Sequence, residues 1–83
     1  MSTWQVALIR EQGVEFGVVV VQDYVLDSPS EREQLLTAWS NQLGRPVALI
    51  GGRRHHTYGR RDIVQWLEGV HPSRLPWRNI TMN

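Results

Sequence analysis

The sequence contains no cysteine and no lysine, and both absences restrict the chemistry open to it. Without cysteine there is neither a disulfide nor a thiolate metal ligand. Without lysine the chain cannot form the Gly-x-x-x-x-Gly-Lys-Ser/Thr loop that cradles nucleotide phosphates. The nine cationic residues other than histidine are all arginines, whose planar forks bind phosphate or carboxylate. A genome rich in G and C would produce the same bias.

The chain also has no long apolar run. A membrane-spanning helix needs about 20 apolar residues, whereas the run of valines at positions 18–21 covers four. The first residues carry neither a basic segment nor an apolar signal core, so we expect a cytoplasmic protein without membrane contact. A length of 83 residues, with 41% hydrophobic and 20% charged, predicts one small globular domain over residues 1–83.

Two stretches near the start are rich in β-forming residues. Residues 3–10 and 14–22 predict two strands, joined at residues 11–13 by a turn whose glycine tolerates a positive φ. The valines at positions 18–21 leave neither side of the second strand polar, which predicts a central strand covered on both faces. The two strands together predict an antiparallel hairpin.

The next segment has the start and stop residues of a helix. Ser28, Pro29 and Glu31 suit the N-cap, the first helical position and the acidic member of a capping box. An apolar stripe at helical spacing follows, formed by Leu35, Leu36, Trp39 and Leu43. Gly44 ends the helix. Residues 46–50 then predict a buried strand, reached by a right-handed parallel crossover.

A second helix and a last strand complete the predicted fold. Residues 63–70 have apolar positions at helical spacing, with Asp62 in the first turn. Residues 77–82 predict an edge strand, because Pro76 has no N–H. The order ββαβαβ predicts a single α/β (α+β) domain with a four-stranded mixed sheet, an N-terminal hairpin and two packed helices. Either each face of the sheet carries one helix, which is the simpler arrangement, or two chains cover each other.

Residues 51–61, Gly-Gly-Arg-Arg-His-His-Thr-Tyr-Gly-Arg-Arg, form a cationic loop between a strand and a helix. The free N–H groups and the dipole of a helix N-terminus favour anions there. Arginines at that end are unfavourable on their own, so they indicate an anion that neutralises them. Alternatively, they point into solvent or pair with Asp62 and other carboxylates. The candidate anion-binding residues are Arg53, Arg54, Tyr58, Gly59, Arg60 and Arg61.

The charge is divided unevenly along the chain. Residues 1–44 carry two arginines against six carboxylates, a balance of −4, whereas residues 45–83 have a balance of +5. Such asymmetry predicts a basic face that attracts acidic partners. The competing interpretation is that folding mixes the two halves into an ordinary surface.

Neither a metal site nor a catalytic centre is expected. His55 and His56 are adjacent, so on an extended chain they point to opposite sides, and His71 is the one other histidine. We therefore expect a non-enzymatic module without cofactor that binds a polyanion, either nucleic acid or a phosphorylated ligand, through the loop at residues 51–61. The alternative is a protein-interaction or assembly domain, homodimeric through the sheet face.

The segment Thr-Tyr-Gly-Arg-Arg-Asp-Ile-Val at residues 57–64, followed by Leu-Pro-Trp at residues 75–77, resembles a family of small, uncharacterised bacterial proteins. The Phe-Gly-Val-Val-Val-Val strand at residues 16–21 and Val-Leu-Asp at residues 25–27 fit the same pattern. The resemblance spans most of the chain and implies a complete, coherent domain. It carries no established activity. In this chain the loop before Tyr58 is shorter and more basic than in that family.

Overall fold

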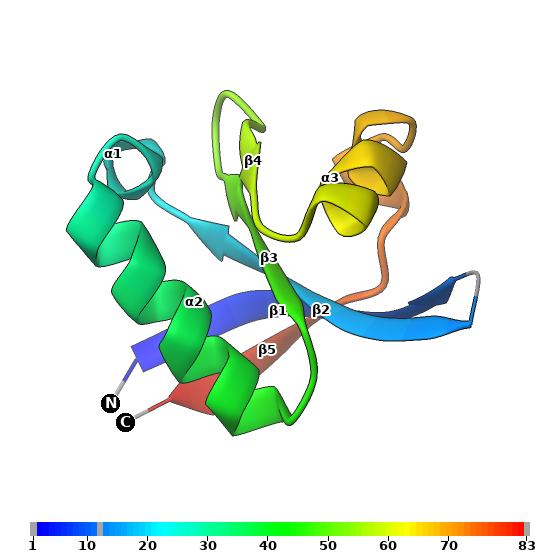
Figure 1. Ribbon diagram of the computed structural model, residues 1–83, viewed down its shortest axis with the longest axis horizontal. Coiled ribbons are helices and arrows are strands. Elements are labelled where there is room, and N and C mark those ends of the chain that lie inside the picture. Colours follow the sequence, from blue (N-terminus) through cyan, green and yellow to red (C-terminus); the bar gives the residue numbers. More distant parts are fainter. Residues whose placement is uncertain (1, 12, 83) are drawn as a thin grey trace.

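A five-stranded mixed sheet organises the chain, and the computed structural model describes residues 2–11 and 13–82 of it (Figure 1). The elements follow one another as β1 (Ser2–Glu11), β2 (Val14–Val21), α1 (Asp23–Leu26), α2 (Pro29–Leu43), β3 (Val47–Gly51), β4 (Thr57–Tyr58), α3 (Arg61–Glu68), the 3-10 helix η1 (Pro72–Arg74) and β5 (Trp77–Met82). Across the sheet the strands are ordered β4-β3-β2-β1-β5.

The sheet combines three antiparallel pairings with one parallel pairing. β1 pairs antiparallel with both β2 and β5, and the short β4 pairs antiparallel with β3. β2 and β3 run parallel because α2 carries the chain back across the sheet. The predicted hairpin, the central position of β2 and the edge position of β5 are confirmed. The prediction of four strands is wrong, because β4 contains two residues and is too short to leave a periodic pattern.

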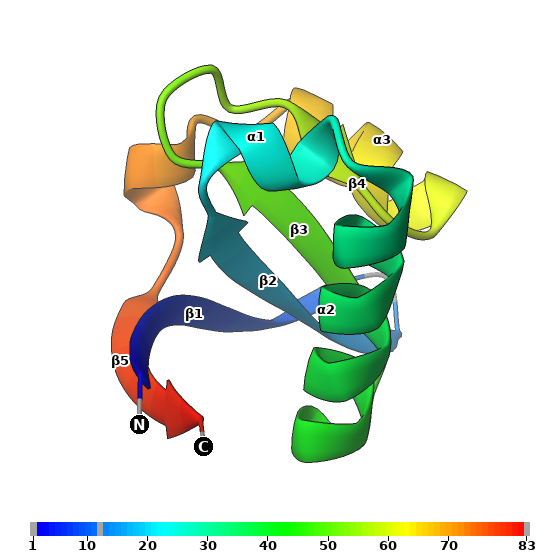
Figure 2. The same ribbon diagram turned by 90° about the vertical axis from the view of Figure 1, so that its left-hand side faces the viewer.

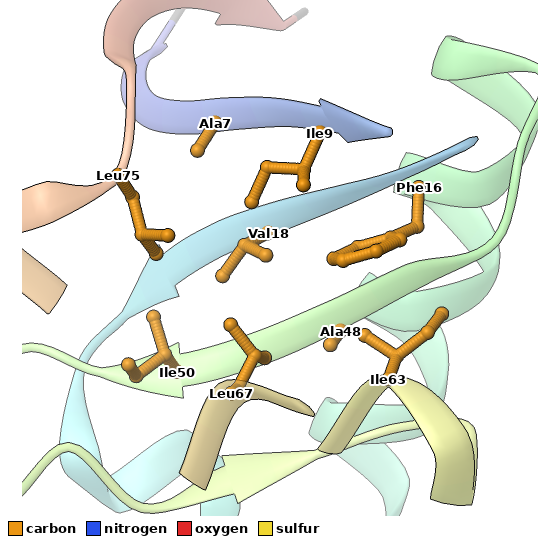
Figure 3. Packing of buried hydrophobic residues seen from close by; sticks show 9 residues of the cluster. All are labelled: Ala7, Ile9, Phe16, Val18, Ala48, Ile50, Ile63, Leu67 and Leu75. Atoms are coloured by element: carbon orange, nitrogen blue, oxygen red, sulfur yellow. The ribbon is translucent and has the colours of Figure 1, made fainter. Parts of the chain in front are cut away.

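Each face of the sheet carries its own hydrophobic core. On one face, α3 packs on the sheet through Ile63 and Leu67 (Figure 3). On the other face, α2 places Trp39 against the side chains that β1, β2 and β3 direct to that face. Alternate residues of β2 serve the two cores, Val18 in the first and Val19 in the second, and both are fully buried. The prediction of one helix on each face is confirmed, and covering the valine strand requires no second chain.

The predicted glycine positions at the end of α2 and in the hairpin turn are confirmed, whereas the predicted side-chain cap of α2 is not. Gly44 ends α2 with a left-handed φ of 67°, as predicted. Ser28 is the N-cap of α2, but its side chain makes no capping hydrogen bond, so the predicted capping box is wrong. Gly13 has a φ of 77° in the predicted hairpin turn, whose middle residue Gln12 lies outside the described residues.

Two short helices were not predicted. α1 spans four residues directly after β2, and η1 spans three. Helices of this length contain too few residues to show apolar periodicity, so the sequence contains no pattern for them. Within the described residues, no helix combines the length and apolar character needed to cross a membrane.

Candidate functional site

The basic loop between β3 and β4 is a closed hairpin tip held by Asp23 of α1. The N–H of Gly51 donates to the carbonyl of His56 at 2.9 Å, which closes the loop. The N–H groups of Arg53 and Arg54 lie 3.3 and 3.5 Å from Asp23 Oδ1. Arg54 Nε lies 3.9 Å from the other carboxylate oxygen. A side chain at Gly51 would collide with this carboxylate, so the glycine permits the close approach.

The arginines at the start of α3 have a different environment. Arg60 Nε and Nη2 donate to the two carboxylate oxygens of Asp62, each at 2.7 Å. The hydrogen bond from Arg60 lowers the pKa of Asp62 from 3.8 to about 2. The anion that neutralises Arg60 is therefore a carboxylate of the helix itself. Arg61 is exposed and forms no ion pair with any residue in the described part of the chain.

The two arginine pairs lie toward opposite ends of β3. Gly59 packs near the start of β3, where an added Cβ would lie 3.0 Å from Ala48 Cα. The pair at residues 53–54 follows the end of β3, a strand of five residues. At about 3.3 Å per residue, the pair at residues 60–61 is separated from it by on the order of 10–15 Å. The structure thus does not gather the predicted loop residues into one site.

Tyr58 of β4 contacts two residues in the N-terminal part of α2. Its hydroxyl donates to Glu33 Oε1, and this hydrogen bond raises the pKa of Tyr58. The guanidinium carbon of Arg32 lies 4.3 Å from the centre of the Tyr58 ring. Arg32 Nη1 also donates to the carbonyl of Leu26 at 2.9 Å. The sequence offers no periodic pattern that pairs residues 32–33 with residue 58, because β4 reaches α2 only through the tertiary fold.

A second basic segment joins the hairpin tip. The ring of His71, just before η1, lies 6.4 Å from the ring of His55 between centroids, at an angle of 71°. Its Nδ1 accepts from the Ser73 N–H at 3.2 Å, which orients the imidazole. Arg74 follows within the same 3-10 turn. We call the exposed basic residues of these two segments the basic end: Arg53, Arg54, His55, His56, His71 and Arg74.

Two features shape the basic end. His55 has a left-handed φ of 59°, which turns the loop back toward β4. A shallow hollow of about 450 Å³ lies beside it, with His55 and His71 on its wall and Glu68 as the one acidic lining residue among those described. Figure 2 shows that the loop between β3 and β4 lies at the same end of the sheet as the segment that leads into β5.

The arrangement offers cationic and aromatic groups for binding. Within the described residues, no three histidine, cysteine, aspartate or glutamate side chains gather closely enough to hold a metal ion. Comparison with family models, curated proteins and solved structures gave no match. The resemblance to small bacterial proteins stays a prediction.

Proposed function

We propose that this domain is a non-enzymatic binding module for a polyanion, and that the basic end is its binding surface. The approach of His71 to His55 carries the proposal, because it brings a second basic segment to the hairpin tip. Single-stranded nucleic acid is the polyanion that this surface favours. Arginines contact phosphates, and exposed imidazole rings stack on unpaired bases.

Two residues that the sequence placed in the binding site have other partners in the structure. Arg60 is held by Asp62, and Tyr58 is held by Glu33 and Arg32. These residues therefore support the fold around the loop. The proposed binding surface is therefore the hairpin tip together with His71.

The test is binding of a fluorescein-labelled 12-nucleotide single strand, followed by fluorescence polarisation between 50 and 200 mM salt. We expect the double substitution Arg53→Gln/Arg54→Gln to weaken binding at least tenfold. The slope of log affinity against log salt should become shallower by about 0.7 for each phosphate that the variant no longer neutralises. His71→Gln should weaken binding at least fivefold, because base stacking is worth about 1–3 kcal/mol per base.

The matched control is Arg61→Gln/Arg78→Gln, which removes the same charge from exposed positions outside the basic end. This variant should bind within threefold of the parent. Equal reductions of affinity in the two double variants would mean that net charge alone governs binding and would contradict a localised site. Equal affinity for inorganic polyphosphate and the oligonucleotide, with no effect of His71→Gln, would contradict base stacking.

A further inference from the structure

The longer of the two sheet edges is formed by β5. This strand has six residues, whereas β4 at the opposite edge has two. β5 pairs with β1 in an unbroken register from the Ala7–Trp77 pair to the Ser2–Met82 pair, so the strand contains no bulge. Figure 2 shows β5 at the outer margin of the sheet.

The ladders fix which residues of β1 face β5. The N–H of Gly17 donates to the carbonyl of Pro46, so the backbone groups of Gly17 face β3. Because the backbone groups of successive residues point to opposite edges of a strand, those of Val18 face β1. The ladder partner of Val18 is Ala7, which therefore faces β2. Val6, the residue before Ala7, consequently faces β5.

Two residues of β5 direct their backbone groups away from the sheet. The ladder partner of Val6 is Arg78, so Arg78 faces β1, and Ile80 does the same two residues later. Asn79 and Thr81 therefore present their N–H and C=O groups at the outer edge. In the described part of the chain, neither residue has a backbone hydrogen bond outside the sheet ladder. The side chains of both are exposed.

The features that usually keep an edge strand from pairing are confined to the start of β5. Proline, charged side chains, bulges and short length serve this purpose in other sheets. Pro76 precedes the strand, and Arg78 is its one charged residue. Residues 79–82, Asn-Ile-Thr-Met, contain neither a charge nor a proline. This part of the edge is open to another strand.

We propose that two copies of the chain associate by antiparallel pairing of their β5 strands, with the twofold axis at Ile80. In this register Asn79 of each copy lies opposite Thr81 of the other. The outward N–H and C=O groups of both residues then bond across the interface, as in any hydrogen-bonded antiparallel pair. The pairing joins the two sheets into one continuous sheet, which is the strand-addition mode of association.

Charge and donor availability select this register. The two Arg78 residues are four positions out of step, which separates them by about 13 Å along the strands. A register centred on Arg78 places like charges directly opposite each other, which is destabilising. A register centred on Asn79 needs the N–H of Trp77, which already donates to the carbonyl of Leu75 at 2.9 Å.

Ile80 gives the interface an apolar centre. Its side chain is partly buried and packs, like Trp4, against the core on the α2 face. Because its backbone groups face β1, the two Ile80 residues form a non-hydrogen-bonded pair, in which side chains lie closest together. A β-branched cross-strand pair stabilises a sheet. The core on the α2 face therefore continues from one copy into the other.

A second copy fits this edge because the interface closes on itself. Both copies use the same strand, so the association stops at a dimer, and the edge left at each end is the two-residue β4. The dimer leaves both covered faces of the sheet unchanged, unlike association through a sheet face. The proposal is independent of polyanion binding, because residues 79–81 lie outside the basic end.

The first experiment is sedimentation velocity between 5 µM and 1 mM protein, at low salt and at 0.5 M salt. We expect the mass to rise from one chain toward two in both conditions, because backbone and apolar contacts carry the interface. Thr81→Pro should weaken association at least tenfold: it removes an outward N–H but no bond to β1. Thr81→Val keeps that N–H and should associate within threefold of the parent.

The second experiment reports the register and does not depend on how the proline variant folds. The chain has no cysteine, so one introduced cysteine gives an unambiguous disulfide. Under oxidised glutathione, Ile80→Cys should cross-link at least tenfold faster than Arg78→Cys on the same face of β5. The Cα atoms of the central pair lie about 4.5 Å apart, within disulfide range, whereas residues 78 are about 13 Å apart.

Three results would overturn the proposal. The first is a monomer at 1 mM, which would leave this edge to a strand of another protein or to none. The second is equal association of Thr81→Pro and Thr81→Val. The third is equal cross-linking of Ile80→Cys and Arg78→Cys, which would mean that the copies meet without this register.

Discussion

The guanidinium of Arg60 donates hydrogen bonds to both carboxylate oxygens of Asp62, two residues further along the chain, where α3 begins. This pair resolves an apparent conflict, because an arginine at the positive end of a helix is unfavourable alone. The carboxylate at the second helical position compensates both the guanidinium and the free N–H groups of the first turn. The same pair leads to the first of four predictions.

Substitution Arg60→Gln should raise the pKa of Asp62 from about 2 toward its ordinary value of 3.8. The measurement is an NMR titration of the Asp62 carboxyl carbon. Because the folded-state pKa is depressed, the pair stabilises the fold above pH 3.8 and this contribution disappears as the pH falls toward 2. Arg61→Gln is the control and should leave the titration unchanged; an equal shift there would contradict the specific pairing.

Substitution Glu33→Ala should lower the pKa of Tyr58 toward its ordinary value of 10, because it removes the hydrogen bond that holds the phenolic proton. Ultraviolet absorbance of tyrosinate measures the change. Since the folded-state pKa is raised, the hydrogen bond stabilises the fold below pH 10 and ceases to do so as the pH rises through the folded-state value. Glu31→Ala removes the same charge from α2 and should leave Tyr58 unaffected; an equal change there would mean that the charge of α2, and not the hydrogen bond, sets this pKa.

Substitution Gly59→Ala should destabilise the protein by about 1–3 kcal/mol, the usual cost of a backbone conformation that only glycine adopts readily. Gly59 has a φ of 155°, and an added Cβ would lie 3.1 Å from the carbonyl oxygen of Val47. Urea denaturation followed by tryptophan fluorescence measures the destabilisation. At Gly52 the nearest atom would be 3.6 Å away, so Gly52→Ala should unfold close to the parent midpoint. Similar destabilisation at both glycines would contradict the explanation.

Substitution Trp39→Ala should destabilise the protein by about 3–5 kcal/mol, as for other large buried side chains. Trp39 is fully buried, and its ring lies 5.8 Å from that of Trp4 in an edge-to-face arrangement. Trp39→Phe should destabilise less, because Trp39 Nε1 has no hydrogen-bond partner among the described residues. Thermal unfolding by circular dichroism compares them with Tyr24→Ala, whose side chain is 59% exposed and whose effect should stay within about 0.5 kcal/mol. A larger effect at Tyr24 than at Trp39 would contradict this ranking.

Local residue patterns were enough to predict most elements. Four adjacent valines predict the central strand β2, Pro29 and Gly44 delimit α2, and Pro76 precedes the edge strand β5. Each of these signals acts within a few residues, through side-chain periodicity, a missing N–H or a left-handed φ. The two-residue β4 and the short α1 escaped prediction because they are too brief to form a pattern.

The candidate sites depend on longer-range relations. The sequence singled out the loop at residues 51–61 and left open whether Arg60 pairs with Asp62; the structure shows that pair. It also separates the two arginine pairs, because β3 runs between them.

By itself, then, the sequence determined the two core helices, the hairpin and the position of β2 at the centre of the sheet. Only the tertiary structure decided that the ring of His71 lies beside that of His55 and that the β1–β2 ladder stops at the Val6–Val19 pair. The physical reason is that both depend on how β5 and α3 pack against the sheet. Packing between segments distant in the chain leaves no spacing rule in the sequence, whereas periodicity and helix ends do.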